Sequence, residues 1–186
     1  MGFELLGSRM LTPYFGSSIF VWGSLISVFM LGLAGGYFLG GIWADKHNTF
    51  NGLSLIILIP ALFILVSIWF YQPLLDAIFI LELGPRGGPL LACLALFTLP
   101  SLFLGMVSPY LVQLLVKNVH HVGRGAGTLY AISTCGSILG TLGTSFYLIL
   151  WMGTRMCLLF MGLGLVFISL LAFIMGRMHQ RIRSAD

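Results

Sequence analysis

Long apolar runs separated by short polar segments are the dominant pattern of this 186-residue chain. A helix needs about 20 mostly apolar residues to cross a bilayer. Five runs reach that length, and they predict membrane-spanning helices over residues 17–44, 53–71, 89–116, 125–151 and 156–176. The predicted fold is therefore all-α, a polytopic membrane helix bundle of about five transmembrane helices that forms a single membrane domain over residues 1–186.

Two shorter segments add to this prediction. Residues 1–16 resemble the end of an earlier helix whose beginning is missing, so we expect a partial N-terminal helix and a shortened or mis-started N-terminus. Between Gln72 and Gly88, two prolines and three charged residues interrupt the chain, and the apolar piece from Leu74 to Leu83 is too short to cross. This piece predicts one interfacial helix. Residues 177–186 follow the last span as a tail.

Composition narrows the class of protein. Hydrophobic residues make up 59% of the chain and charged residues only 8%, with a mean hydropathy of +1.05, whereas a soluble domain carries about 25% charged residues. A water-soluble fold is therefore excluded. The net charge of +4 does not indicate nucleic acid as a partner, because the basic residues are scattered singly between the apolar runs. The partner that composition predicts is the lipid bilayer.

The positions of the basic residues predict the orientation. With five spans the connecting segments alternate between the two sides of the membrane, and one side receives two thirds of the lysines and arginines: Lys46, Lys117, Arg124, Arg177, Arg181 and Arg183. The other side receives Arg9, Arg86 and Arg155. Because positively charged segments stay inside the cell, we expect a multi-pass protein with a cytoplasmic C-terminus.

Small residues recur at helical spacing in two of the predicted spans. In the first span Gly32, Gly36 and Gly40 are four residues apart and share one helix face. The fourth span carries a similar stripe that includes Gly136 and Gly140. Small residues allow the close helix approach that holds membrane bundles together. We expect the first and fourth spans to form the packed centre, and we favour ordinary packing within the chain over a homodimer seam or a substrate groove.

Residues suited to acid, base or metal chemistry are sparse. From residue 17 onward no charged residue lies at the centre of a span, and Glu4 and Arg9 precede the first span. The adjacent His120 and His121 would not share a helix face and have no further ligands nearby. The three cysteines are far apart in apolar runs and are interpreted as small buried residues: Cys93, Cys135 and Cys157. We expect no catalytic site, no metal and no cofactor, so the chain is not predicted to be an enzyme.

The fourth span also carries the most polar helix face of the predicted bundle. This hydroxyl row consists of Tyr130, Ser133, Thr134, Ser137 and Thr141. Serine and threonine in a membrane helix usually bond their own backbone or a neighbouring helix. A structural role is therefore favoured, and a polar ligand-binding face stays open as the alternative.

Three stretches carry a resemblance to a known family. They are ELLGSRMLTPYFGSSIFVWGSLISVFMLGLAGGYFLGGIWADK, then GMVSPYLVQLL, then VGRGAGTLYAISTCGSILGTLGTSFYLI with GTR shortly after. Together they resemble the membrane domain of the bacterial fused major-facilitator/spermidine-synthase-like proteins, in which a transporter-like bundle precedes a cytosolic aminopropyltransferase-type domain. The likeness covers nearly the whole chain but includes no part of the cytosolic domain, so the family's enzyme activity cannot be carried over. It implies the bacterial inner membrane as the location.

The segment GGIWADK is also similar to the short cytoplasmic motif that follows the second helix of major-facilitator transporters. By that likeness Gly40, Gly41, Asp45 and Lys46 would form a structural and gating joint at the cytoplasmic end. We include Arg124, in the basic loop on the same side, in this cytoplasmic joint.

Three functions are compatible with the sequence. The first is a non-catalytic membrane module that anchors or assists a partner, such as a separately encoded synthase-like protein. The second is a half-transporter that moves polyamines or other small polar solutes after pairing with a second copy of itself. The third is an accessory subunit of a larger membrane protein complex.

Overall fold

The computed structural model describes residues 1–46, 49–115 and 122–183, and within these ranges every regular element is a helix. The chain order is α1 (Gly2–Phe15), α2 (Ile19–Lys46), α3 (Phe50–Ile80), α4 (Gly84–Leu115), α5 (Val122–Gly143), the π-helix η2 (Thr144–Leu148), α6 (Ile149–Trp151) and α7 (Thr154–Arg183). Five of the helical segments are long and apolar enough to cross a membrane, the fourth being α5 to α6 taken together. The predicted all-α bundle with five transmembrane helices is confirmed.

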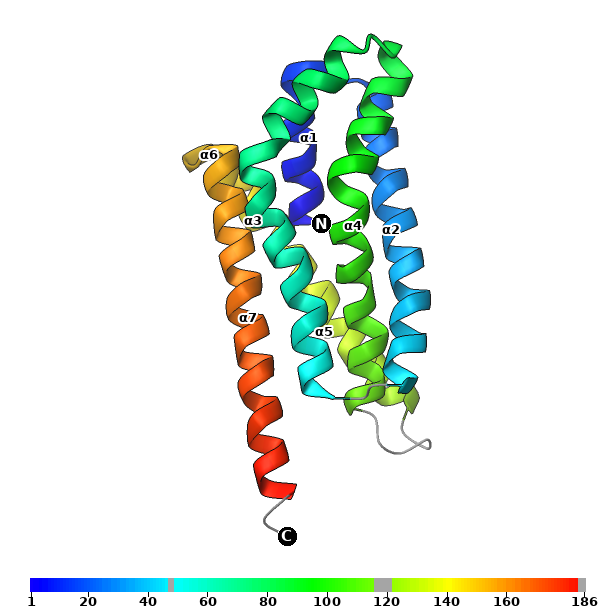
Figure 1. The fold of residues 1–186 in the computed structure, drawn as a ribbon, viewed down its shortest axis with the longest axis vertical. Helices are drawn as coiled ribbons and strands as arrows, with labels where there is room; N and C mark the ends of the chain where they lie inside the picture. Colours follow the sequence, from blue (N-terminus) through cyan, green and yellow to red (C-terminus); the bar gives the residue numbers. More distant parts are fainter. Residues whose placement is uncertain (47–48, 116–121, 184–186) are drawn as a thin grey trace.

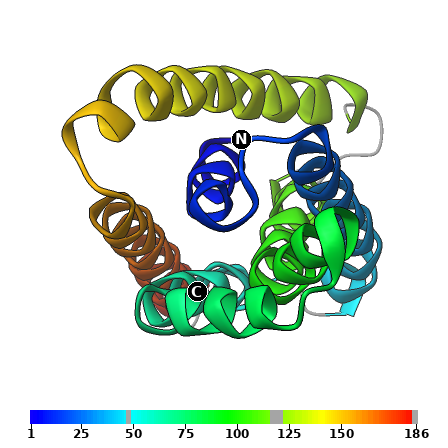
Figure 2. The ribbon, with the colours of Figure 1, turned by 90° about the horizontal axis from the view of Figure 1, so that it is seen from above.

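The helices form a ring with α1 at its centre. Seen from above, α2, α4, α3, α7 and α5 surround α1 (Figure 2). In the side view α1 occupies only the upper half of the bundle, and its first residue lies near mid-height (Figure 1). The partial N-terminal helix expected from the sequence is therefore an internal element of the bundle.

The expected interfacial helix is not a separate element. The helix α3 continues through Pro73 to Ile80, and α4 already begins at Gly84, so only a short turn separates them. A proline removes one backbone hydrogen bond, but ending the helix in a lipid environment would leave several backbone groups without partners. Continuing α3 to the end of the bundle therefore costs less free energy than ending the helix earlier.

Aromatic side chains fix α1 between α2 and α4. The ring of Phe3 packs edge-on against Phe29 and Phe97, with centroid separations of 5.7 and 5.3 Å, and Phe29 stacks on Phe97 at 5.4 Å. On the same helix Leu6 and Leu11 have no exposed surface. The short α1 is thus held by the apolar core that fills the upper half of the bundle.

The glycine face of α2 lies against α4. A Cβ atom built on Gly36 would lie 2.9 Å from the Cα of Gly105, and one built on Gly40 would lie 2.7 Å from the Cα of Met106. Gly32 approaches Ser101 in the same way. The prediction that this face packs against the fourth span is wrong, because its partner is the third span, which also carries a small residue, Gly105, at the crossing point.

A pair of buried serines joins α3 to α7. The hydroxyl of Ser54 donates to the carbonyl oxygen of Ser169 at 2.9 Å, and the hydroxyl of Ser169 donates to the carbonyl oxygen of Ser54 at 2.8 Å. The two helices also approach closely farther along, since a Cβ on Gly162 would lie 2.6 Å from the side chain of Leu65. Interhelical hydrogen bonds of this kind hold membrane helices together where lipid supplies little hydrophobic drive.

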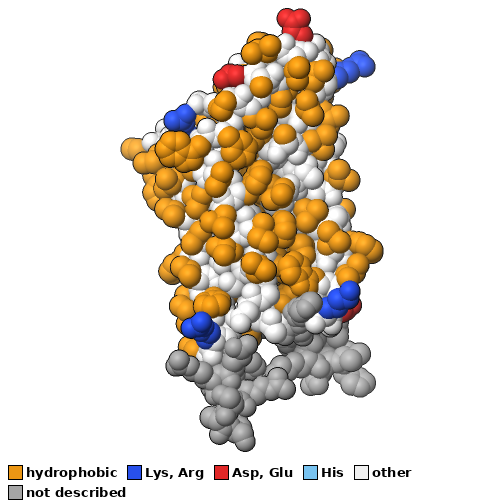
Figure 3. All heavy atoms as spheres, viewed as in Figure 1, with side chains coloured by type: hydrophobic (Ala, Val, Ile, Leu, Met, Phe, Trp, Pro, Cys, Tyr) orange, Lys and Arg blue, Asp and Glu red, His pale blue; other side chains and the backbone are white. Residues whose placement is uncertain are grey.

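Charged side chains are confined to the two ends of the face seen in Figure 3, and a broad hydrophobic band separates them. Large apolar side chains point outward along the spans, among them Phe38, Trp69 and Phe167, which are 69%, 85% and 62% exposed. Such a surface is stable only in contact with lipid. The chain is therefore a multi-pass membrane protein whose direct environment is the bilayer.

Candidate functional site

The hydroxyl row of the fourth span runs along α5 and is partly satisfied by its own helix. The hydroxyl of Thr134 donates to the carbonyl oxygen of Tyr130 at 2.8 Å, and that of Thr141 donates to the carbonyl oxygen of Ser137 at 2.7 Å. These are the local bonds that hydroxyl side chains usually make in a helix interior. They leave Tyr130 and Ser133 exposed and Ser137 half-buried.

Within the described chain, α1 covers one end of the hydroxyl row. The first turn of α1 lies there, since a Cβ on Gly2 would be 2.8 Å from the hydroxyl oxygen of Thr144 and 3.5 Å from the carbonyl oxygen of Gly140. Farther along α5, a Cβ on Gly136 would meet nothing within 4 Å among the described residues. The result is a helix face of small and polar residues that stays largely open.

Two predictions about α5 are wrong for the described chain. One is that Gly136 and Gly140 are packing glycines, and the other is that Cys135 is buried. A Cβ on Gly140 would also meet no atom within 4 Å, so neither Gly136 nor Gly140 serves as a packing glycine here. The reason is that α4 occupies the face of α2 that α5 was expected to fill. Cys135 is exposed on α5, whereas Cys93 and Cys157 are buried as expected.

The position of α1 gives Glu4 an unexpected environment. Glu4 lies in the first turn of α1, and α1 begins near mid-height of the bundle (Figure 1). The side chain is half-buried, and no described group donates a hydrogen bond or forms an ion pair with its carboxylate. The sequence placed this charge before the first span, because a helix that turns back into the centre of the bundle leaves no pattern that distinguishes it from a flanking segment.

Arg9 of the same helix stabilises the broken end of the fourth span. Its guanidinium donates to the carbonyl oxygen of Ile149 at 2.9 Å, directly after the π-helix and within a few residues of the helix end at Trp151. A cation near the C-terminal end of a helix interacts favourably with the carbonyl groups that have no partner there. Arg9 is exposed and links α1 to α6 through this bond, whereas from the sequence it contributed only to the predicted orientation.

The predicted cytoplasmic joint corresponds to a set of contacts that α4 makes with the end of α2 and with Thr49. The side chain of Asp45 accepts a hydrogen bond from the amide of Gln113 at 3.3 Å. The hydroxyl of the buried Tyr110 donates to the carbonyl oxygen of Thr49 at 2.8 Å and accepts from the backbone N–H of Thr49 at 3.1 Å. Lys46 is exposed beside them. The side chain of Arg124 and the pair His120 and His121 lie outside the described residues.

The sequence did not identify Tyr110, which forms the strongest contact of this joint. A tyrosine near the end of an apolar helix is ordinary in a membrane protein, because both membrane interfaces are rich in aromatic residues. Its contact with Thr49 forms only because α4 packs beside the start of α3, and no spacing of residues along the sequence reveals this packing.

Comparisons of the chain with models of protein families, with curated proteins and with solved structures give no match. The architecture and the contacts above therefore rest on this chain alone. They define a multi-pass helical bundle in lipid with an open polar face on α5, a half-buried carboxylate on α1 and a tied joint at one end.

Proposed function

We propose that the chain is a non-catalytic integral membrane module that anchors or assists a partner protein, and that the partner contributes a helix to the open part of the hydroxyl row on α5. The observation that carries this proposal is the uncovered α5 face of small and hydroxyl-bearing residues. The resemblance to the membrane domain of spermidine-synthase-like proteins supports the first part of the proposal, since that domain works beside a second unit, which in that family is cytosolic.

Such a face is less stable in contact with lipid than in contact with another helix. Acyl chains cannot accept or donate hydrogen bonds, and small side chains leave shallow grooves that lipid fills less closely than another helix does. The ring hydroxyl of Tyr130 and the hydroxyl of Ser133 are exposed within the described chain. A helix that packs along the hydroxyl row would bury both groups and supply hydrogen-bond partners.

Thiol crosslinking in native membranes tests the proposal. The two residues Ser133 and Cys135 are two positions apart, which places them about 200° apart around a helix. A Ser133→Cys, Cys135→Ser variant therefore puts the single exposed thiol of α5 on the hydroxyl row, while the natural chain has it on the opposite face. The thiol is labelled with benzophenone-4-maleimide, which alkylates the cysteine and on irradiation inserts into a C–H bond of a neighbouring chain. We expect a crosslinked product from the variant and none from the natural chain.

The mass of the product identifies the partner. A product larger than the chain by the mass of another polypeptide, identified by mass spectrometry, supports the proposal. Recovery of the uncrosslinked chain alone from both proteins, with thiol labelling verified in denaturant, would overturn it. A product of twice the chain's mass would instead show that the occupant is a second copy.

We further propose that the C-terminus is cytoplasmic and that the membrane is the bacterial inner membrane. Both α2 and α7 end at the same end of the bundle (Figure 1), and these ends carry Lys46 and Arg177. The positive-inside rule assigns that end to the cytoplasm. A C-terminal reporter that fluoresces only in the cytoplasm is expected to be bright, and a bright signal from a periplasm-specific reporter at the same site would reverse the orientation.

A half-transporter that acts as a dimer is the second candidate, and Glu4 is the observation that favours it. A carboxylate at depth in a membrane bundle commonly takes part in binding a cation or a proton. Proteoliposomes should then accumulate spermidine above protein-free liposomes, and Glu4→Gln should abolish the difference. Equal uptake with and without the natural protein, in preparations where crosslinking verifies the dimer, would remove this candidate.

A further inference from the structure

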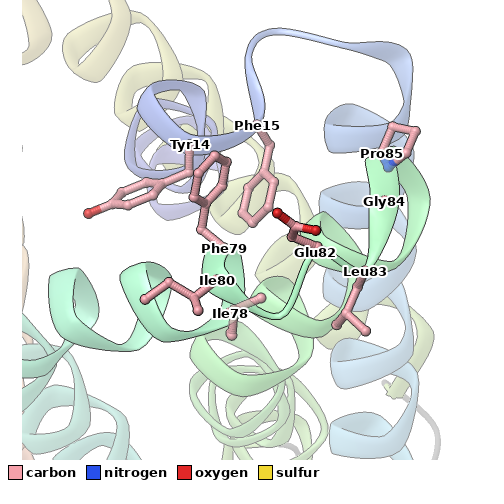
Figure 4. Close-up of a pocket in the computed structure, with 10 residues that line it drawn as sticks. Tyr14, Phe15, Ile78, Phe79, Ile80, Glu82, Leu83, Gly84 and Pro85 are labelled. Atoms are coloured by element: carbon pink, nitrogen blue, oxygen red, sulfur yellow. The ribbon is translucent and has the colours of Figure 1, made fainter.

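A cavity opens at the end of the bundle opposite to the cytoplasmic joint. It lies between the end of α1 and the turn that connects α3 to α4, and ten residues line it (Figure 4). Its volume is about 560 Å³, which falls within the range of about 300–1,000 Å³ typical of small-molecule sites. The lining is mostly apolar, and Glu82 is the one charged residue among these ten.

Three aromatic rings form one wall of this cavity. The centroids of Tyr14, Phe15 and Phe79 are 6.2 to 6.4 Å apart in all three pairs, with interplanar angles from 43° to 63°. The hydroxyl of Tyr14 lies near the Asp76 carboxylate, and burial together with this carboxylate raises the pKa of Tyr14. The rings are therefore held in a defined arrangement.

Glu82 projects a carboxylate beside the Phe15 ring (Figure 4). Within the described chain its side chain has no hydrogen bond and no ion pair, although Arg86 is only four residues away. The guanidinium of Arg86 instead lies 5.4 Å from the centroid of Phe20, outside the cavity lining. Arg155, in the first turn of α7, donates to the side chain of Gln72. Glu82 is exposed, and within the described chain no cation pairs with its carboxylate.

The backbone at Glu82 supplies an independent observation. Its φ angle is +45°, and it is the one residue other than glycine with a positive φ among the described residues. Glycine or asparagine is the usual residue at such a position after a helix end, and a larger side chain there costs of order 1–3 kcal/mol. Strained positions of this kind cluster at binding sites, where the strained residue presents a side chain that the site needs.

We propose that this cavity binds an organic ammonium group. Aromatic faces attract such a cation through their quadrupole, and a carboxylate beside the rings adds direct charge attraction. Ile80 and Leu83, which also line the cavity, suit the alkyl part that an organic ammonium carries. An anion would be repelled by Glu82, and a neutral apolar ligand would gain nothing from the carboxylate.

The ammonium group has two possible sources that share this chemistry. The cavity lies at the end of the bundle where α3 turns into α4 (Figure 1), and charged side chains mark that end of the face seen in Figure 3. The choline or ethanolamine head group of a phospholipid can therefore reach it. A free quaternary or primary amine in solution can reach it as well. The test below has one arm for each source.

The first arm uses choline and its neutral isostere, 3,3-dimethylbutan-1-ol. The full chain is reconstituted in nanodiscs of phosphatidylglycerol, which contains no ammonium group, and saturation-transfer NMR follows the methyl protons of each compound. The second arm uses native mass spectrometry to compare retention of phosphatidylcholine with retention of phosphatidylglycerol. We expect preference for the charged compound in the first arm, for phosphatidylcholine in the second, or in both.

Four variants separate the contributions. Glu82→Gln removes the charge and Phe15→Leu removes the π face, and each is expected to weaken binding about two- to fivefold. Phe15→Tyr keeps a π face and should bind like the natural chain. Trp151→Leu is the control, since it removes an exposed aromatic ring that does not line the cavity. Thermal melting of each variant shows whether it is folded.

Each outcome decides the proposal. Choline binding in phosphatidylglycerol nanodiscs that weakens in Glu82→Gln supports a free amine, and selective retention of phosphatidylcholine that weakens in the same variant supports a lipid head group. The proposal is overturned if the neutral isostere binds as well as choline and phosphatidylglycerol is retained as well as phosphatidylcholine. It is also overturned if Glu82→Gln and Phe15→Leu both bind like the natural chain.

Discussion

Replacing Gly36 with alanine tests the close contact between α2 and α4. The added Cβ would lie 2.9 Å from the Cα and 3.1 Å from the carbonyl carbon of Gly105, and closer still to the carbonyl oxygen of Leu102. All three are backbone atoms, so no side chain can rotate away. The two helices must separate by several tenths of an ångström or more along this part of their interface.

The cost follows from that separation. A gap of 0.5–1 Å removes about a quarter to a half of the dispersion energy of each affected atom pair, and overpacking of this kind costs about 1–3 kcal/mol. Because the clash involves backbone, we take about 2–3 kcal/mol, near the upper part of that range. Alanine recovers about 1 kcal/mol through its higher helix propensity. The expected net loss in the free energy of unfolding is about 1–2 kcal/mol.

Gly41 is the matched control on the same helix. A Cβ there would meet no described atom within 4 Å, so Gly41→Ala should be neutral or stabilise by up to about 1 kcal/mol. Unfolding by titration with sodium dodecyl sulfate in mixed micelles, followed by circular dichroism, gives the free energy of each variant. Equal stability of Gly36→Ala and Gly41→Ala would refute the contact between α2 and α4 at this position.

Three further changes test other contacts. In a double-mutant cycle of Ser54→Ala and Ser169→Ala, the coupling in the same unfolding assay should be about 0.6 kcal/mol and no more than about 1.7, and a coupling of zero would mean that the reciprocal bonds do not form. Tyr110→Phe removes both hydrogen bonds to Thr49. It should lower the free energy of unfolding by about 1–2 kcal/mol and speed proteolysis of the α2–α3 connection. Unchanged cleavage would show that these bonds do not hold the connection. Glu82→Gly should be more stable than Glu82→Ala by about 1 kcal/mol. Both variants remove the carboxylate, but only glycine accepts a φ of +45° without strain. Equal melting temperatures would argue against strain at this residue.

The number and character of the helices could be predicted from the sequence because they depend on local composition. A run of 20 apolar residues is sufficient to predict a span, whatever it packs against. The extent of α3 could not be predicted in the same way. The prolines and charges between Gln72 and Gly88 suggested a break, and the helix nevertheless continues to Ile80, because a membrane environment penalises free backbone groups more than it penalises one proline.

Helix pairing was the weaker part of the prediction. Glycine spacing correctly marks a face at Gly36 that another helix approaches, but it contains no information about which helix does so. Two spans offered a stripe of small residues, and the partner proved to be α4, where the single Gly105 at the crossing point suffices. The cavity beside Glu82 could not be predicted from the sequence either, because its walls come from the end of α1 and from the α3–α4 turn, which are far apart in sequence.

The serine pair between α3 and α7 has a consequence for how the protein is made. Ser54 and Ser169 are 115 residues apart, and ribosomes add about 5–20 residues per second, so α3 enters the membrane on the order of ten seconds before its partner exists. During that interval the hydroxyl of Ser54 must turn back to a carbonyl of its own helix, as serine does in isolated membrane helices. Arrival of α7 then exchanges this local bond for the interhelical one, so α3 gains this partner only after α7 has been made.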